Sequence, residues 1–549
     1  MKNKNKNKKK NTFAAAISIL LAVNGLTSQA ESFFDYALNN HALGLYSGNQ
    51  FQLNHGACQN CPITPQALWY FEQETIAIPF SNAKSFDPSL SAQNDVKQWY
   101  RTPTNPSMPP LIWLGSPHIT SGKLSQNGKW LENANSKIQL TITPKIESNL
   151  SYYNVNSEQH FAGRNIVVRG TSQDAQFTAR SMWPLDYNLN LQQIPYQPLA
   201  SQETIADLIR AQNGGADKPF AARVLYKKPE LVSLENKPVL GFVLNGAQGD
   251  DDEAHGGHFA VATGRFGANG EWHDWLVNNF YNLGAVSEKG IIAASLPMDS
   301  YQGDLNSGQS WYRPSYMLVA VLKDERSAAT YQSAINRVMQ HFYRQDFSYR
   351  HAGVNCAGIN VETLRSLDWN IPKHGATNLS KAFVALPYKA ISDMSLESGL
   401  KAYDYLSAEQ TNLYPFVTFE TIGNDLLTRI AKGQANSAFE KQLADDLEAI
   451  IYVHIPQFPS SRAMGQAPVA SLDEYMARTP ADMAEWKIIP VGARQFPEAL
   501  KDKNAPADAI RPAYYGLAAW LVILILMLFG LRKILQKLYK KNYDESQTI

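Results

Sequence analysis

The sequence predicts a mixed α+β fold with a single membrane-spanning helix close to its C-terminal end. Short alternating runs of apolar and polar residues, broken by Gly and Pro, occur through residues 31–235 of the 549-residue chain and are typical of strands. Longer apolar strands and two helical patterns follow them. An uncharged apolar run then comes after residue 512. The chain is long enough for about three ordinary domains.

The first thirty residues have the pattern of a secretory signal peptide. A lysine-rich head (MKNKNKNKKK) precedes the apolar run TFAAAISILLAVNGL, and small residues occupy Ser28 and Ala30. Small side chains at these two positions suit cleavage before Glu31. We therefore predict that residues 1–30 are a signal peptide and that the mature chain is exported.

The second apolar run extends from Ala513 to Leu531 and contains 19 residues without a charge. This length is sufficient to cross a bilayer, although a buried core helix is the alternative. Five basic residues follow the run at once, namely Arg532, Lys533, Lys537, Lys540 and Lys541. The bias of basic residues towards the cytoplasm predicts that residues 511–549 form a transmembrane helix and a short cytoplasmic tail, with residues 31–510 outside the cytoplasm.

The near-neutral net charge of the whole chain conceals an acidic exported part. Residues 31–510 contain 38 basic and 47 acidic residues, for a formal charge of −9. A negative surface of this kind repels phosphate backbones and anionic lipid headgroups. We therefore expect no nucleic-acid partner.

Three regions are distinguished by their patterns inside the exported part. Residues 31–235 contain alternating runs such as KIQLTITP and NIVVRGTSQDAQFTARSMW, which predict a β-rich region. Residues 236–390 combine the strands PVLGFVLN, HFAVATGRF, EWHDWLVNNFYN and YMLVAVL with an amphipathic helix from Arg326 to about Tyr343. Residues 391–510 show helical patterns, including FEKQLADDLEAIIYV, and then become rich in Pro and irregular.

An unpaired cysteine occurs in the stretch VNCAGINVETLRSL, residues 354–367. Asn355 is a good N-cap residue, and Val361 and Leu364 recur on one face of the helix that would follow. Cys356 would then lie in the first turn, where unpaired N–H groups and the helix dipole favour a thiolate. The alternative is a small buried apolar residue, which is a common role for a free cysteine.

A histidine and an asparagine on a predicted hairpin are the candidate partners of this thiol. Strands at 258–266 and 271–281 around the loop GANG place His258 directly opposite Asn279. A histidine base oriented by an amide is what a thiol nucleophile requires. His273, on the same strand face as Asn279, is the weaker orienting residue, and a one-residue slip would place Asn278 opposite His258 instead.

The order of these residues resembles that of the permuted papain-like thiol hydrolases, whose relatives include lecithin:retinol acyltransferase and the NlpC-type peptidases. More closely, GGHFAVA, LVNNFYNLGA and FSYRHAGVNCAGINVETLRSL are similar to the Lnb N-terminal periplasmic domain, a bacterial family of poorly defined function. The matching pairs are Gly257–His258, Asn279–Phe280 and Asn355–Cys356. The resemblance covers about a quarter of the chain and implies a papain-like fold with Cys356, His258 and Asn279 as catalytic residues.

Together these observations predict a thiol hydrolase, needing no cofactor, on the periplasmic side of a bacterial inner membrane. Attack of Cys356 on an amide or ester would give an acyl-thioenzyme. A peptidoglycan peptide is the favoured substrate because the cell wall lies within reach of a tethered domain. Two alternatives stay open: a thiol acyltransferase acting on a lipid or lipoprotein, and a non-catalytic protein that binds the wall or a partner through a vestigial papain-like fold.

Three further motifs give weaker signals. Cys58 and Cys61 form a C-x-x-C that favours a local disulfide in an exported protein. The run GDDDEAHGGH places His255 three residues before His258, but these side chains diverge in a strand, so we expect a solvated loop and not a metal site. His351 is a reserve base and is otherwise a loop residue.

Overall fold

The structure, a computed structural model, describes residues 75–79, 87–102, 111–211 (except 115, 117, 135, 147–148, 152 and 174–175), 219–280, 293–343, 349–489 and 512–546. It confirms a mixed α+β fold with an apolar helix at the C-terminal end. The predicted signal peptide and the Cys58–Cys61 motif lie outside the described residues.

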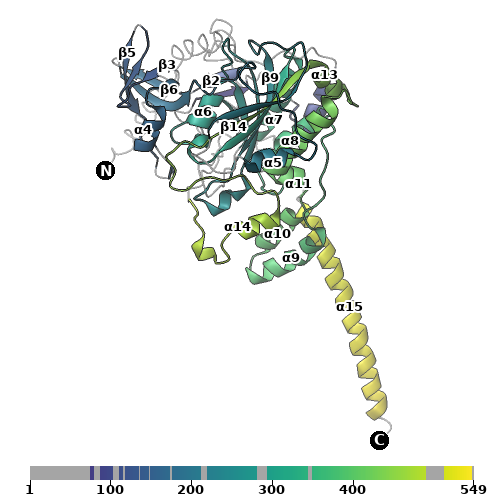
Figure 1. The fold of residues 1–549 in the computed structure, drawn as a ribbon. Coiled ribbons are helices and arrows are strands. Elements are labelled where there is room, and N and C mark those ends of the chain that lie inside the picture. The colour runs from purple at the N-terminus through teal and green to yellow at the C-terminus, as the bar shows by residue number, and fades with distance from the viewer. Residues whose placement is uncertain are drawn as a thin grey trace, which may run out of the picture.

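A nine-stranded antiparallel sheet forms the centre of the body (Figure 1). Its strands in spatial order are β2 (Leu111–Leu114), β1 (Ile76–Pro79), β12 (Ala293–Pro297), β11 (Leu276–Phe280), β10 (His258–Arg265), β9 (Pro238–Asn245), β13 (Ser315–Leu322), β14 (Leu447–Ile455) and β8 (Ala221–Lys227). The sheet therefore takes strands from all three predicted regions of the exported part and not from residues 236–390 alone.

The middle of this sheet is buried on both faces. Every residue of β9 and β13 is buried, in agreement with their unbroken apolar runs PVLGFVLN and SYMLVAVL. β14, whose sequence LEAIIYVHI continues a helical pattern, was predicted as helix, and that prediction is wrong. Only its first part is helical, as α13 (Ala438–Asp446). The β-branched Ile450, Ile451 and Val453 favour a strand once β13 and β8 pair with them on both sides.

Helices cover the sheet near β9 and β10. α7 (Arg326–Tyr343) and α8 (Cys356–Ser366) pack against β10, together with α12 (Pro415–Asp425), and α3 (Ala92–Arg101) packs on α7 and α8. The predicted bounds of α7 and the predicted start of α8 are confirmed. The thiol of Cys356 thus lies between one helix end and the central sheet.

A closed five-stranded barrel is attached to one side of the body (Figure 1). Its strands in spatial order are β3 (His118–Leu124), β4 (Trp130–Glu132), β5 (Lys137–Ile142), β7 (Gln176–Pro184) and β6 (Asn165–Gln173), and α4 (Val155–Phe161) lies between β5 and β6 in the chain. Two ion pairs join the barrel to α6 (Met298–Gly303) and the residue after it: Arg169–Asp299 at 2.5 Å and Arg180–Asp304 at 2.6 Å.

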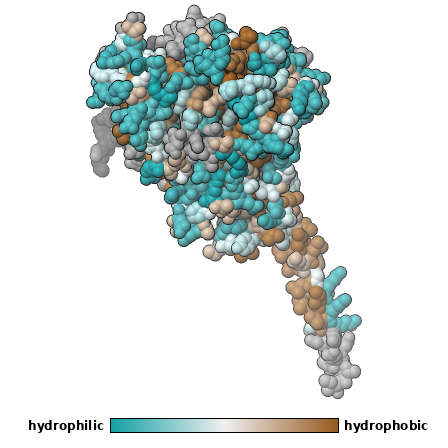
Figure 2. All heavy atoms as spheres, in the orientation of Figure 1, coloured by the Kyte–Doolittle hydropathy of each residue, from teal (hydrophilic) through white to brown (hydrophobic). Residues whose placement is uncertain are grey.

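Further helices complete the described part of the chain. They include α5 (Ile205–Ala211), α9 (Leu379–Ser392), α10 (Leu396–Ser407), α11 (Gln410–Leu413), a π-helical turn (Leu426–Ile430), α14 (Leu472–Arg478) and α15 (Pro512–Ser546). α15 projects from the body, and its segment Pro512–Lys540 is long and apolar enough to cross a membrane (Figures 1 and 2).

Candidate thiol site

The hairpin that carries His258 has a register two residues away from the predicted one. β10 pairs with β11 through Val261 and Asn278, so Asn279 lies opposite Ala260 and not opposite His258. The shift arises because residues 271–275 belong to the turn and β11 begins at Leu276. A shift of two residues keeps every side chain on its face, so His258 and Asn279 are diagonal neighbours on the same face. The ring Nε2 of His258 makes a short hydrogen bond to Oδ1 of Asn279.

The two alternative orienting residues have other positions. His273 lies in the turn and not in a strand, and it is buried with neither ring nitrogen hydrogen-bonded to a described residue. Asn278 donates to Gln332 at 2.9 Å and accepts from Ser295 at 2.6 Å, so it holds β11 to its neighbours. Only Asn279 of the three predicted candidates contacts His258.

The glycine before His258 has a steric explanation. Gly257 has a φ of +72°, which favours glycine, and a Cβ at this position would lie 2.5 Å from the carbonyl oxygen of Asn245 and 2.6 Å from Cβ of Pro468. Any other residue would push the start of β10 away from its neighbours. Gly257 therefore fixes the position of the backbone at His258, the first residue of β10.

His258 is held as a neutral imidazole. Its side chain is 6% exposed, and burial, followed by the nearby charge of Arg313, lowers its pKa to about 3 although the hydrogen bond to Asn279 acts in the other direction. Because an amide oxygen can only accept a hydrogen bond, Nε2 carries the ring proton. Nδ1 is therefore the basic nitrogen of this ring.

The helix that carries the cysteine begins as predicted. Cys356 is the first residue of α8, and the side chain of Asn355 caps the helix by accepting from the N–H groups of Ala357 (3.0 Å) and Gly358 (2.7 Å). The amide group of Asn355 also donates to the carbonyl oxygen of Leu413 at 3.0 Å. The cap thus fixes both the helix end and its position against α11.

The backbone N–H groups of Phe259 and Ala357 and the hydroxyl group of Tyr349 act on the thiol of Cys356 in the direction that lowers its pKa. Phe259 directly follows His258 in β10, so the start of this strand lies near Cys356. We expected the helix terminus to favour the thiolate. Burial outweighs these donors and raises the pKa of Cys356, because the charged form is desolvated more than it is hydrogen-bonded.

Two residues at the site were not identified from the sequence. Tyr349 accepts a hydrogen bond from the N–H of Cys356 at 3.2 Å, so its hydroxyl lies beside both the nitrogen and the sulfur of this residue. Its place in FSYRHAGVNC, shortly before the cysteine, was the only available signal.

Arg313 is the second such residue, and no sequence motif marks it. It is 7% exposed and donates from Nε to Oε1 of Gln309 (2.9 Å) and from Nη1 to the carbonyl oxygen of Gly246 (3.3 Å). Its charge lowers the pKa of both His258 and Cys356. Arg313 therefore contributes a buried positive charge close to the thiol.

The other predicted candidates have different surroundings. His351 is exposed in the turn before α8, with its ring 5.7 Å from that of Tyr349. His255 lies 3.5 Å from Asp252 in a 3₁₀ turn (Asp252–Gly256). Within the described ranges no group of three His, Cys, Asp or Glu side chains is arranged to hold a metal ion.

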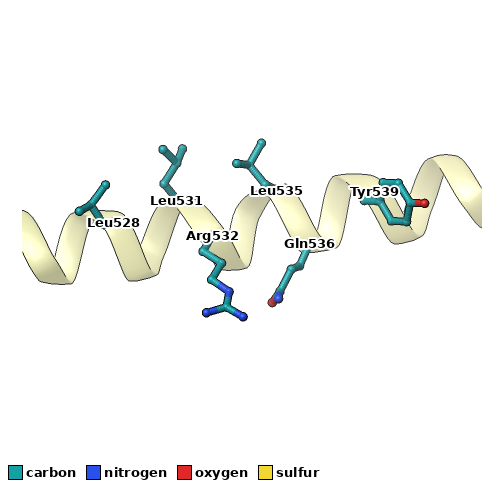
Figure 3. A pocket seen from close by; sticks show the side chains of 6 residues that line it. All are labelled: Leu528, Leu531, Arg532, Leu535, Gln536 and Tyr539. Carbon is teal, nitrogen blue, oxygen red and sulfur yellow. The ribbon is translucent and has the colours of Figure 1, made fainter.

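A shallow groove elsewhere in the molecule runs along α15 (Figure 3). It is lined by Leu528, Leu531, Arg532, Leu535, Gln536 and Tyr539. All six residues belong to α15, the one helix among the described residues that is apolar enough to cross a membrane, so the groove is part of the surface of that helix. It brings together no groups suited to catalysis.

Comparison of the chain with protein-family models, with curated proteins and with solved structures gives no match. The chemistry of the thiol site therefore rests on its own geometry.

Proposed function

We propose that this protein is a membrane-anchored cysteine enzyme that cleaves an amide or ester on a papain-like domain, with Cys356 as nucleophile, His258 as base and Asn279 as the residue that orients the base. One observation carries the proposal. The N–H of Phe259 lies close enough to Cys356 to act on its thiol, and Phe259 directly follows His258, whose ring is held by the amide oxygen of Asn279. Nucleophile, base and orienting group are the three parts that this class of catalysis requires.

The reaction consists of two balanced steps. The sulfur attacks the substrate carbonyl, its proton passes to Nδ1 of His258, and a tetrahedral oxyanion forms. The C–N or C–O bond then breaks, the leaving amine or alcohol takes the proton from His258, and the acyl group remains on Cys356 as a thioester. Water or another acceptor next gives its proton to His258 and attacks the thioester, which releases the product and restores the thiol.

The raised pKa of the thiol and the lowered pKa of the imidazole define the resting state as a neutral pair and not an ion pair. Proton transfer therefore accompanies the attack, as in serine hydrolases. The buried charge of Arg313 favours the negative charge that develops near the sulfur. The N–H of Cys356 donates to the hydroxyl group of Tyr349 in this structure, and the oxyanion would take the place of that hydroxyl group.

We further propose that α15 spans a bacterial inner membrane, with residues 31–510 in the periplasm and the basic tail in the cytoplasm. The basic residues after Leu531 support this orientation. A peptide of the cell wall is then the first candidate substrate, because the wall is the polymer within reach of the tethered body.

Acyl transfer to a lipid or lipoprotein acceptor is the second candidate, and the burial of the sulfur favours it. Cys356 is only 4% exposed, and a site that excludes water slows hydrolysis of the thioester relative to transfer to a bound acceptor. The acyl group would in that case come from a membrane lipid and not from the wall.

Mass spectrometry of the full chain tests both candidates. The wild type and His258→Ala are incubated separately with wall fragments and with phospholipid, and peptides that contain Cys356 are searched for an acyl adduct that neutral hydroxylamine removes. We expect an adduct on the wild type with one of the two substrate classes and none on His258→Ala. The absence of an adduct with either class would favour a non-catalytic binding protein.

A further inference from the structure

We propose that the hairpin of α9 and α10 is a second membrane-binding element that inserts an apolar face into the leaflet nearest the body. This proposal rests on α15 spanning the bilayer, but it does not depend on the chemistry of Cys356. The face consists of Val384, Tyr388 and Ile391 on α9 together with Met394 and Leu396 at the turn. The lipid bilayer is the partner that fits it.

The hairpin is fixed to the beginning of α15. One face of α15, with Ala513 and Gly516 buried and Trp520 partly buried, packs against α9 and α10. A Cβ at Gly516 would lie 2.5 Å from the ring of Tyr403, so the two helices approach closely. The indole N–H of Trp520 donates to the carbonyl oxygen of Phe383 in α9 at 2.6 Å. α15 and the hairpin therefore form one unit (Figure 1).

The position of Trp520 within the apolar run determines the depth of this unit. The uncharged run from Ala513 to Leu531 has 19 residues and ends at Arg532. At a rise of 1.5 Å per residue it spans about 28 Å, which is close to the thickness of the hydrocarbon core. The run is therefore just long enough to cross this core. Trp520 comes seven residues after Ala513, so it lies about 10 Å along the run from its outer end. Because the indole N–H of Trp520 is bonded to Phe383, this part of α9 lies in the outer part of the leaflet nearest the body.

The exposed side chains of α9 suit that environment. Val384, Tyr388 and Ile391 follow an i, i+4, i+7 spacing on one side of the helix and are 65%, 67% and 76% exposed, and Met394 is 94% exposed. An apolar stripe of this kind is typical of helices that lie in the membrane interface, where tyrosine is also favoured. In water the same stripe would be an unexplained apolar patch.

Two charged side chains beside the stripe pair with each other. Lys389 forms an ion pair with Asp393 at 3.1 Å, and Asp393 also accepts hydrogen bonds from Ser392 and Ser398. Pairing reduces the cost of moving these two groups towards the apolar phase.

Lipid-depth quenching of the full chain tests the proposal. The protein is reconstituted in nanodiscs of phosphatidylethanolamine and phosphatidylglycerol with an environment-sensitive fluorescent amino acid at Ile391. The matched control carries the same probe at Val232, an aliphatic residue that is 79% exposed and lies outside the hairpin. We expect blue-shifted emission and strong quenching by lipids with a nitroxide high on the acyl chain at position 391, and neither effect at position 232.

A second variant separates insertion from misfolding. With the probe at Tyr388, the substitutions Val384→Asp and Ile391→Asp are expected to abolish quenching by lipid and restore quenching by aqueous iodide, whereas Val232→Asp changes neither. Equal lipid quenching at positions 391 and 232 would overturn the proposal. Protection of position 391 that grows with the number of chains per disc would also overturn it, because a second copy of the chain would then cover the face.

Discussion

Two histidines of the same sequence segment are equally buried but have different surroundings. His258 is 6% exposed and His273 is 4% exposed, and burial lowers the pKa of each to about 3. The ring of His258 is held by Asn279, and the next residue, Phe259, lies near enough to Cys356 to act on its thiol. Neither ring nitrogen of His273 is hydrogen-bonded to a described residue.

His273 lies in a cluster of buried residues at the junction of the barrel and the body. Its carbonyl oxygen accepts from the N–H of Asp299 at 2.7 Å, and Asp299 is paired with Arg169 of the barrel. The charge of Arg169 contributes to the lowered pKa of His273, and burial raises the pKa of the neighbouring Asp274 well above its usual value. This cluster joins the barrel to the body.

The comparison shows that a strongly perturbed pKa does not by itself identify a catalytic histidine. Burial produces the same shift at both positions. What distinguishes His258 is its surroundings, because its ring is held by the amide of Asn279 and the next residue, Phe259, lies near Cys356.

The largest expected difference is in the rate of acyl-adduct formation when each histidine in turn is replaced by glutamine. His258→Gln removes the base and should lower the rate of acyl-adduct formation on Cys356 by about 10²- to 10⁴-fold. His273→Gln should leave this rate, measured per folded molecule, within a few-fold of the wild type. Quantitative mass spectrometry of the adduct against time measures both, and a similar loss in the two variants would contradict the assignment of His258.

Removing the charge of Arg169 from the cluster around His273 should lower the stability of the fold and leave the rate of acylation of Cys356 unchanged. Arg169→Met leaves the carboxylate of Asp299 buried without its ion pair, so the free energy of unfolding should fall by about 3–5 kcal/mol. The double change Arg169→Met with Asp299→Leu should recover most of this loss. Denaturant unfolding in detergent measures the stability, and an unchanged stability in Arg169→Met would show that the pair does not join the two units.

The adjacent residues Asn279 and Asn278 provide a smaller contrast. Asn279→Ala releases the ring of His258 and should slow acylation by up to about 10²-fold, the effect of misplacing a catalytic group. Asn278→Ala leaves Gln332 and Ser295 without their buried partner and should lower the free energy of unfolding by about 1–3 kcal/mol at an unchanged rate. If Asn278→Ala alone slowed acylation, Asn278 and not Asn279 would be the residue that orients His258.

Both histidines should make the stability of the fold depend on pH in the same way. The pKa of each is about 3 in the folded chain and about 6.5 in an unfolded one, so only the unfolded chain gains a proton as the pH falls below 6.5. Each histidine thus destabilises the wild type by up to about 1.4 kcal/mol per pH unit between these values. Relative to the wild type, His258→Gln and His273→Gln should both become more stable as the pH falls.

The rate of acylation should separate the two histidines again under the same conditions. Because Nδ1 of His258 stays unprotonated well below neutral pH, the wild type and His273→Gln should acylate Cys356 at similar rates at pH 5 and pH 7. Rates per folded molecule, measured in parallel with stability, check this. A steep loss of rate near pH 6.5 would show that the active base has an ordinary histidine pKa.

Several features of the site follow from the sequence because they depend on local physics. Asn355 caps α8 through its own side chain, and the apolar runs of β9 and β13 mark strands buried on both faces. The face shared by His258 and Asn279 follows from the alternation of side chains along strands, and it survives a wrong register because the error is two residues. The long uncharged run of α15 is equally local.

Other features could not be predicted because they depend on residues far apart in the chain. The turn of the hairpin is longer than expected because the ring of Trp275 packs against Gly264, where a Cβ would lie 2.2 Å away, and its N–H donates to Arg265. β14 became a strand because β13 and β8 pair with it. No local pattern brings the charge of Arg313 to the thiol.

The sequence by itself determined the pieces of this protein: a capped helix headed by a thiol, a hairpin with an imidazole and an amide on one face, and an apolar helix long enough for a bilayer. Only the tertiary structure decided which histidine is held by an amide oxygen and in which direction each pKa moves. The reason is that hydrogen bonds and side-chain alternation act over a few residues, whereas desolvation depends on everything that the fold packs around a group.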